Sequence, residues 1–166
     1  MKLTPVEKIA IEMSELADDP RYCKEKDIIN MIKELSNINE RDRDGRTLLV
    51  SAALYELTGI AKYLIKHGAD TQLADKEGFT VLHAATYTGC YGIAKMVLCK
   101  DFPVNAQDKY GNTALHRAKH TDLKLIKLLV DNGADSKIEN NYGVSAYQSF
   151  LAYPKIIKIF DNEIEK

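Results

Sequence analysis

Two histidines are the residues of this chain whose type and spacing could support chemistry. His83 and His116 lie 33 residues apart, and each ends the same segment of threonine, an apolar residue and leucine. Imidazole serves as a metal ligand and as a general base, so the pair could belong to a metal-dependent hydrolytic site. A structural role in a repeated motif is the alternative hypothesis.

Three aspartates recur in the same way. Asp42, Asp75 and Asp108 each stand three residues before a glycine. A carboxylate at such a turn can accept hydrogen bonds from nearby backbone N–H groups. Because consecutive repeats place these side chains along an extended stack, we do not expect them to meet as a catalytic carboxylate pair.

Other chemical motifs give no further candidate. The three cysteines, Cys23, Cys90 and Cys99, include no Cys-x-x-Cys pair, and we expect buried, reduced thiols, with Cys90 and Cys99 too far apart to pair. The sequence has no phosphate-binding loop, nucleophile elbow, His-Glu-x-x-His pair or dinucleotide fingerprint. We therefore expect no metal, no cofactor and no catalytic residue.

The composition predicts one folded domain of 166 residues, with 45% hydrophobic and 28% charged residues. The 23 Lys and Arg residues nearly balance the 24 Asp and Glu residues, for a net charge of -1. Such a balance lacks the field that concentrates nucleic acid or anionic lipid. The cluster of Arg41, Arg43 and Arg46 alternates with acidic residues, so we expect a solvated face there. Nucleic-acid binding by this cluster is a second, disfavoured hypothesis.

The amino terminus reaches charged residues immediately and has no apolar core of signal-peptide length. No apolar run of 18 residues occurs anywhere in the sequence. We expect no membrane partner and a cytoplasmic or nuclear protein.

A repeat organises the chain. The segments that begin at Gly45, Gly78, Gly111 and Gly143 share a Gly-x-Thr/Ser-x-apolar pattern, and the glycines are separated by 33, 33 and 32 residues. A second motif keeps the same phase, because His67-Gly68-Ala69-Asp70 recurs as Asn132-Gly133-Ala134-Asp135. A fixed period of this length predicts a stack of similar units.

These residues resemble the ankyrin repeat, with its Thr-Pro-Leu-His-x-Ala core. The resemblance covers residues 45–143 well and the rest more loosely. The sequence differs from the family at the proline, which is replaced by Leu48, Val81, Ala114 and Ala146, and at the histidine, which is Val50 in the first clear repeat and Gln148 in the last. The resemblance implies that His83 and His116 are structural, and that turn tips and inner-helix surfaces bind a partner.

Apolar spacing supports two short helices in each repeat. Leu49, Ala52 and Ala53 predict the first helix of one unit, and Ile60, Tyr63 and Leu64 predict its second. The third unit lacks one residue between Lys119 and Leu125, and we place this deletion in the turn between its two helices. Gly68 and Gly133 follow the second helices, where a left-handed residue ends a helix.

Divergent units are expected at both ends. Thr4 and Glu7 fit a capping box, which predicts a helix from Pro5 to about Ala17, and a second helix is predicted near residues 27–35. Pro154 separates a short helix from a last one at residues 155–162. We therefore predict one all-α ankyrin solenoid of about five helix pairs, with hairpin-like turns: a capping unit at 1–43, three clear repeats at 44–142 and a capping repeat at 143–166.

Aromatic and charged residues predict the partner-binding surface. Tyrosine and arginine are enriched among binding hot spots, and several lie beside the turns or at the end of a first helix. The predicted contact residues are Arg43, Asp44, Arg46, Tyr55, Lys76, Glu77, Phe79, Tyr87, Lys109, Tyr110, Asn112, Arg117, His120 and Tyr142.

The favoured function is non-enzymatic recognition of another protein through the concave groove that these residues would form. We expect an inhibitor, immunity-type or adaptor subunit that is a monomer when free. The metal-dependent enzyme and the nucleic-acid-binding protein remain the alternatives.

Overall fold

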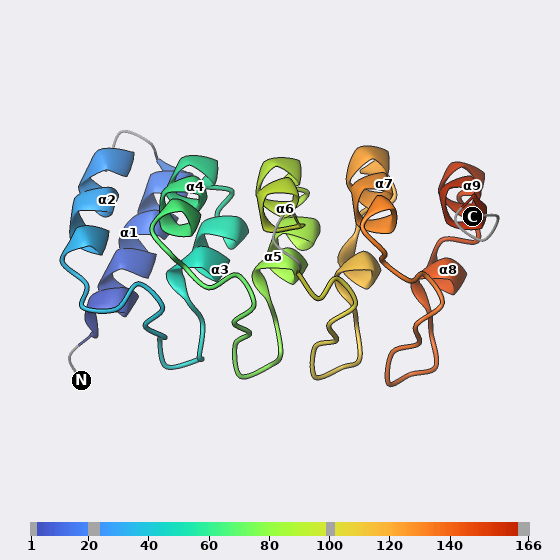
Figure 1. Ribbon diagram of the computed structural model, residues 1–166, viewed down its shortest axis with the longest axis horizontal. Helices are drawn as coiled ribbons and strands as arrows, with labels where there is room; N and C mark the ends of the chain where they lie inside the picture. Colours follow the sequence, from blue (N-terminus) through green and yellow to red (C-terminus); the bar gives the residue numbers. More distant parts are fainter. Residues whose placement is uncertain (1–2, 20–23, 99–101, 163–166) are drawn as a thin grey trace.

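The structure is a computed structural model that describes residues 3–19, 24–98 and 102–162. Helices pack in pairs that stand side by side along the long axis of the molecule, and hairpin loops project from the same side of successive pairs (Figure 1). The helices within the described residues are α1 (Pro5–Asp18), α2 (Glu25–Lys33), α3 (Leu48–Leu54), α4 (Thr58–Lys66), α5 (Val81–Thr88), α6 (Tyr91–Leu98), the 3-10 helix η1 (Ala114–Arg117), α7 (Leu123–Asp131), α8 (Ala146–Ser149) and α9 (Pro154–Asp161). The predicted all-α solenoid is confirmed.

The two helices of a pair have different surroundings. We call α3, α5, η1 and α8 the inner helices, because they lie next to the hairpin loops, and α4, α6, α7 and α9 the outer helices (Figure 1). The hairpin loops are residues 41–47, 74–80, 107–113 and 139–145. Isolated β-bridges close three of them: Arg41 with Thr47, Ala74 with Thr80, and Glu139 with Ser145.

Local sequence starts each helix where the pattern predicts. At α1 the Glu7 backbone N–H donates to Thr4 Oγ1 at 3.2 Å and the Thr4 N–H donates to Glu7 Oε2 at 2.8 Å, so the predicted capping box is confirmed. The glycines after α4 and α7, Gly68 and Gly133, have φ of +89° and +87°, as expected for residues that end a helix.

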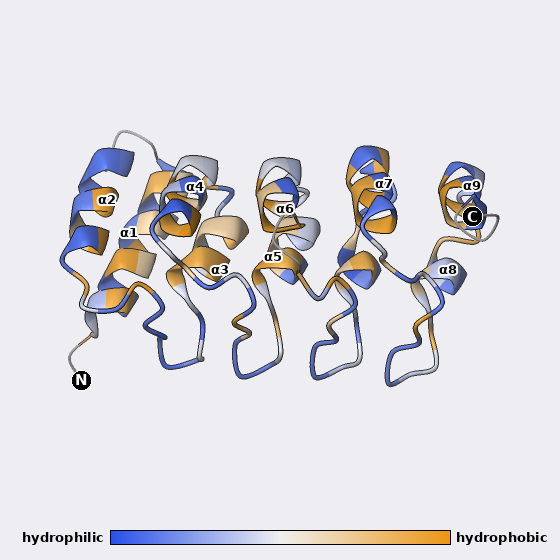
Figure 2. Ribbon diagram, viewed as in Figure 1, coloured by the Kyte–Doolittle hydropathy of each residue, from blue (hydrophilic) through white to orange (hydrophobic). Residues whose placement is uncertain are grey.

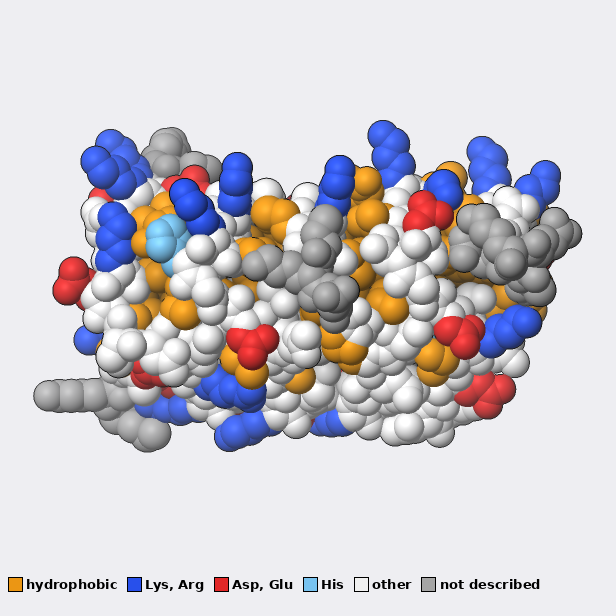
Figure 3. Space-filling view, in the orientation of Figure 1, with side chains coloured by type: hydrophobic (Ala, Val, Ile, Leu, Met, Phe, Trp, Pro, Cys, Tyr) orange, Lys and Arg blue, Asp and Glu red, His pale blue; other side chains and the backbone are white. Residues whose placement is uncertain are grey.

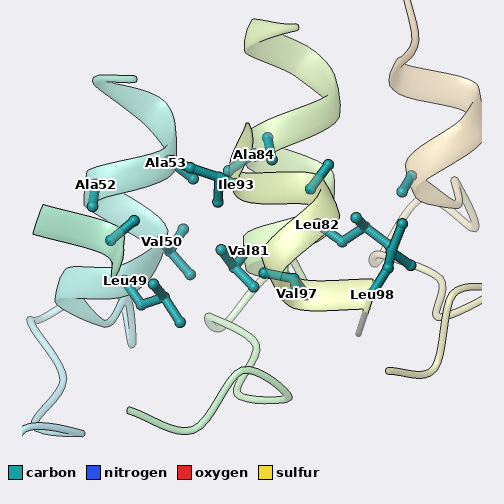
Figure 4. Close-up of a cluster of buried hydrophobic side chains, with 14 of the residues drawn as sticks. Leu49, Val50, Ala52, Ala53, Val81, Leu82, Ala84, Ile93, Val97 and Leu98 are labelled. Atoms are coloured by element: carbon teal, nitrogen blue, oxygen red, sulfur yellow. The ribbon is translucent and has the colours of Figure 1, made fainter. Parts of the chain in front are cut away.

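Small and branched apolar side chains form one continuous core. Ala52, Ala53, Ala84 and Ala85 are fully buried, and their size lets the inner helices of adjacent repeats approach closely. Figure 4 shows side chains of α3, α5 and α6 filling the space between two repeats. Hydrophobic residues gather on the helices, whereas the tips of the hairpin loops are hydrophilic (Figure 2).

The third repeat differs from the prediction. Its inner helix is the four-residue 3-10 helix η1, and Ala118, which we expected on the helix, is extended with ψ of 141°. The deletion is therefore absorbed by shortening the inner helix, and not by the turn alone. The connection to α7 spans residues 118–122, and α7 keeps its buried Leu125 and Leu129.

Two smaller predictions end differently. Cys90 lies between α5 and α6, as expected, but it is half-buried and not fully buried. Cys23 and Cys99 lie outside the described residues, and so does the predicted separation of Cys90 from Cys99. None of the helices in the described ranges has the length and apolar character needed to span a bilayer.

Candidate functional site

Turn residues shape each hairpin loop from within. Oδ1 of Asp75 accepts the backbone N–H groups of Glu77 and Phe79, both at 2.9 Å. Asp42, Asp108 and Asn140 do the same in their own loops, each with the residues two and four positions later. The predicted local role of the three aspartates is confirmed.

Neighbouring loops are joined to each other by backbone hydrogen bonds. The N–H of Lys76 donates to the Asp44 carbonyl at 3.0 Å, and the N–H of Lys109 donates to the Glu77 carbonyl at 2.7 Å. The N–H of Asn141 continues this series to the Tyr110 carbonyl at 2.9 Å. The loops therefore form one connected, pre-shaped edge along the stack.

The two histidines connect adjacent repeats. Nδ1 of His83 accepts the Thr80 backbone N–H at 3.2 Å, and Nε2 lies 3.0 Å from the Asn112 carbonyl of the next repeat. His116 repeats this arrangement with Thr113 and with the Val144 carbonyl at 3.1 Å. Since Nδ1 accepts, Nε2 carries the proton and donates to the carbonyl. Both ring nitrogens are thus engaged in structure.

Burial also sets the charge state of these rings. It lowers the pKa of His83 below its ordinary value of 6.5, although the hydrogen bond to Asn112 acts in the opposite direction. Burial lowers the pKa of His116 in the same way, against the hydrogen bond to Val144. Within the described residues, no three His, Cys, Asp or Glu side chains come close enough to hold a metal ion.

A pocket of about 400 Å³ lies between the hairpin loops and the inner helices. Three successive loops and the ends of three inner helices contribute its lining: Arg46, Leu54, Asp75, Glu77, Phe79, Tyr87, Asp108, Tyr110 and Arg117. We call the surface that these nine residues form the hairpin face. It combines exposed aromatic rings with guanidinium and carboxylate groups.

Ion pairs and ring contacts hold the polar side chains of this face. Arg117 donates through Nη2 to Asp108 Oδ2, and its Cζ lies 5.8 Å from the centre of the Phe79 ring. Lys109 forms an ion pair with Glu77, and its Nζ lies 4.9 Å from the centre of the Tyr110 ring. Burial acts to raise the pKa of Asp108, but the hydrogen bonds from Arg117, Asn112 and Tyr110 outweigh it, so this pKa lies below its ordinary value of 3.8.

Six of the predicted contact residues line this one pocket: Arg46, Glu77, Phe79, Tyr87, Tyr110 and Arg117. Lys109 contacts two of them. The loop residues Asp44 and Lys76 have exposed side chains, and Tyr142, 74% exposed, lies at the tip of the last loop.

The structure places four other predicted residues away from the pocket. Arg43 pairs with Glu7 of α1 at 2.8 Å, and Tyr55 ends α3 half-buried against the core. The Asn112 side chain accepts a hydrogen bond from Asn140 at 3.0 Å. His120 stacks on Tyr153, with ring centres 4.5 Å apart, beside a separate cavity of about 350 Å³ near the start of α9.

Three lining residues were absent from the predicted set: Leu54, Asp75 and Asp108. Repeat register could have identified Leu54, because it lies seven residues after Thr47, just as Tyr87 lies seven residues after Thr80. The aspartates were assigned only to the turns, yet they also form part of the pocket lining.

Basic side chains gather elsewhere. Exposed lysines lie on every outer helix, and Figure 3 shows Lys and Arg side chains along the edge that these helices form. The nine residues of the hairpin face come from other segments. The pocket is therefore distinct from the most basic edge of the molecule.

Comparisons with known proteins agree with this architecture. A family model for ankyrin repeats in three copies matches residues 21–108, more than half of the chain. A second model, for ankyrin repeats in many copies, matches residues 87–130. No curated protein matches the chain. With the paired helices, the hairpin loops and the connecting histidines, these matches show that the chain belongs to the ankyrin-repeat family.

Proposed function

We propose that this chain is a non-enzymatic module that binds a protein partner through its hairpin face. Ankyrin repeats generally mediate protein–protein interaction, and proteins built from them are typically binding modules without catalytic activity. The observation that carries the proposal is the pocket of about 400 Å³ to which three consecutive repeats contribute aromatic and arginine side chains. Tyr and Arg are the residue types most enriched at interface hot spots.

The backbone of the face is pre-shaped for binding. Each loop is held from within by its aspartate and is joined to the next loop by a backbone hydrogen bond. A surface that is already ordered loses little conformational entropy on association. Tyr87, 57% exposed, and Tyr110, 42% exposed, offer contact area at little ordering cost.

The test is affinity capture from cells that express the protein, followed by identification and quantification of the bound proteins. The variant carries Tyr87→Ala and Tyr110→Ala together, and the matched control is Tyr91→Ala, because Tyr91 is 41% exposed but lies on outer helix α6. Thermal unfolding first checks that both variants remain folded. We expect the double variant to lose a stoichiometric partner that wild type and control retain. Equal recovery by all three proteins would contradict the proposal.

Within this function we propose an inhibitor, immunity-type or adaptor role for a cytoplasmic chain that is monomeric when free. Measuring the activity of the captured partner with and without the protein separates the roles. Loss of activity in the complex supports inhibition or neutralisation, and full activity supports an adaptor. Light scattering of the free protein checks the monomer, and a fluorescent fusion checks the compartment.

A further inference from the structure

The hairpin face contains hydrogen-bond donors that nothing in the described structure satisfies. Nε of Arg46 and Nε of Arg117 are both buried, and neither has a hydrogen-bond partner among the described residues. Arg46 also has no ion pair with any described carboxylate, whereas Arg117 is held by Asp108. A buried charged donor without an acceptor is costly, so an acceptor that entered the pocket would be favoured at these atoms.

Most acceptors of the pocket are already engaged. Oδ1 of Asp75 accepts two backbone N–H groups, and Asp108 accepts two more in addition to Arg117. Glu77 is paired with Lys109. One acceptor position, Oδ2 of Asp75, has no donor among the described residues. The unmet capacity is therefore mainly for donating, with Arg46 as the one pocket cation that lacks a carboxylate partner in the described part of the chain.

Apolar groups surround these donors. Leu54, Phe79, Tyr87 and Tyr110 line the same pocket, and Arg117 rests over the Phe79 ring. The volume of about 400 Å³ falls in the range of roughly 300–1,000 Å³ that suits small ligands. An occupant can thus place an apolar group against the rings while its polar end reaches Arg46.

We propose that the pocket binds a carboxylate-bearing segment of the protein partner, in which an acidic group lies beside an aromatic or aliphatic side chain. The carboxylate accepts a hydrogen bond from Nε of Arg46, and the apolar group packs against Phe79, Tyr87 and Leu54. A guanidinium recognises a carboxylate with strong, directional hydrogen bonds, which a neutral acceptor matches only weakly. This inference rests on the proposed function and names the chemistry that the hairpin face recognises.

Three small probes that share a phenyl ring test this chemistry. Phenylacetate carries a carboxylate, phenylacetamide carries a neutral amide, and 2-phenylethylammonium carries a cation. Protein labelled with ¹⁵N-arginine reports on each probe through the Nε–H resonances of Arg46 and Arg117, which Arg→Lys variants assign. We expect phenylacetate to shift the Arg46 resonance saturably, phenylacetamide to bind several-fold more weakly, and the ammonium probe to leave the resonance unchanged.

Two variants locate the binding. Arg46→Lys keeps the positive charge but removes the Nε–H group and the planar fork, so the affinity for phenylacetate should fall about tenfold, as expected for one charge-assisted hydrogen bond. The shifts of Phe79 and Tyr87 backbone amides follow binding in this variant. Lys76→Gln is the control, because Lys76 is an exposed cation of a neighbouring loop that does not line the pocket. It should leave the affinity unchanged.

Preferential binding of 2-phenylethylammonium would overturn the proposal in favour of a cation at Asp75. Equal binding of the three probes would reduce the site to an apolar pocket, and no binding by any probe would also overturn the proposal. If phenylacetate fails while the Tyr87 and Tyr110 double variant still loses the partner, the proposed function stands and only the carboxylate chemistry is wrong. If phenylacetate binds and the double variant keeps the partner, the reverse holds.

Discussion

Replacement of His83 tests how adjacent repeats are held together. The ring is 1% exposed, accepts the Thr80 backbone N–H and donates to the Asn112 carbonyl of the next repeat. His83→Ala removes both hydrogen bonds and leaves two backbone groups without these partners, each at a cost of about 1–3 kcal/mol. With the small cavity added, we expect the free energy of unfolding to fall by about 3 to 5 kcal/mol. This is a large fraction of the stability of a typical domain.

The matched variant is His83→Gln. The last repeat already carries glutamine at this position, where Oε1 of Gln148 accepts the Ser145 backbone N–H at 2.7 Å. A glutamine at 83 can cap the helix in the same way and can still donate toward the next repeat, so we expect a loss of only about 1 kcal/mol.

Urea unfolding of wild type and both variants, monitored by circular dichroism, gives the three free energies from the midpoint and slope. A loss below 1 kcal/mol for the alanine variant would refute the reasoning, and so would equal losses for both variants. Zinc is added in a parallel series. Because both ring nitrogens are engaged in the fold, we expect zinc to leave the unfolding midpoint unchanged, and stabilisation by zinc would instead support the metal-site hypothesis.

Three further predictions follow from single features of the fold. The pKa values of His83 and His116 lie below 6.5 in the folded state, so the unfolded state binds more protons; stability should decrease as pH falls through 6.5 toward the folded-state values and then level off, and the double glutamine variant should lose this slope in urea titrations at several pH values. The pKa of Asp108 is lowered from 3.8, so its contribution should be complete above that pH and lost as pH falls through the folded-state value; subtracting the acid unfolding curve of Asp108→Asn from that of wild type measures it, and a contribution that grew on acidification would be wrong in sign. Gly111→Ala should destabilise by at least 2 kcal/mol more than Gly133→Ala: both glycines have positive φ, which costs a side chain about 1–2 kcal/mol, but a Cβ at 111 would lie 2.7 Å from a backbone nitrogen of the next loop, whereas a Cβ at 133 meets nothing within 4 Å. Equal thermal shifts for the two glycine variants would contradict this last account.

Repetition made most of the fold predictable. The glycine period locates each hairpin loop, and the threonine three residues before each repeated histidine locates the start of an inner helix. Both signals are local, because turns and caps are formed by residues within four positions of each other. The residue boundaries of the capping units, at 43 and 143, stay predictions.

The shortened inner helix of the third repeat could not be predicted in the same way. Residues 114–120 include good helix formers, so propensity alone favours a full helix. The missing residue has to be absorbed before α7, whose buried Leu125 and Leu129 pack in the stack, and this requirement comes from tertiary packing. The chain gives up the end of the inner helix and keeps the outer helix in place.

The candidate site was predictable in part. Residues beside the turns, such as Phe79 and Tyr110, were correctly placed next to one another because register determines their position. Arg46 and Arg117 belong to different repeats, and their meeting in one pocket depends on the direction of each side chain across the stack. His120 was expected with them, but the lengthened connection after η1 brings it to Tyr153.

The central claim is that a protein partner binds the hairpin face. Hydrogen–deuterium exchange of the protein, alone and in complex with its captured partner, measures this contact along the whole chain. We predict that added protection appears in the hairpin loops at residues 41–47, 74–80 and 107–113 and at the end of α5. Protection confined to outer helices α4, α6 and α7 would contradict the account.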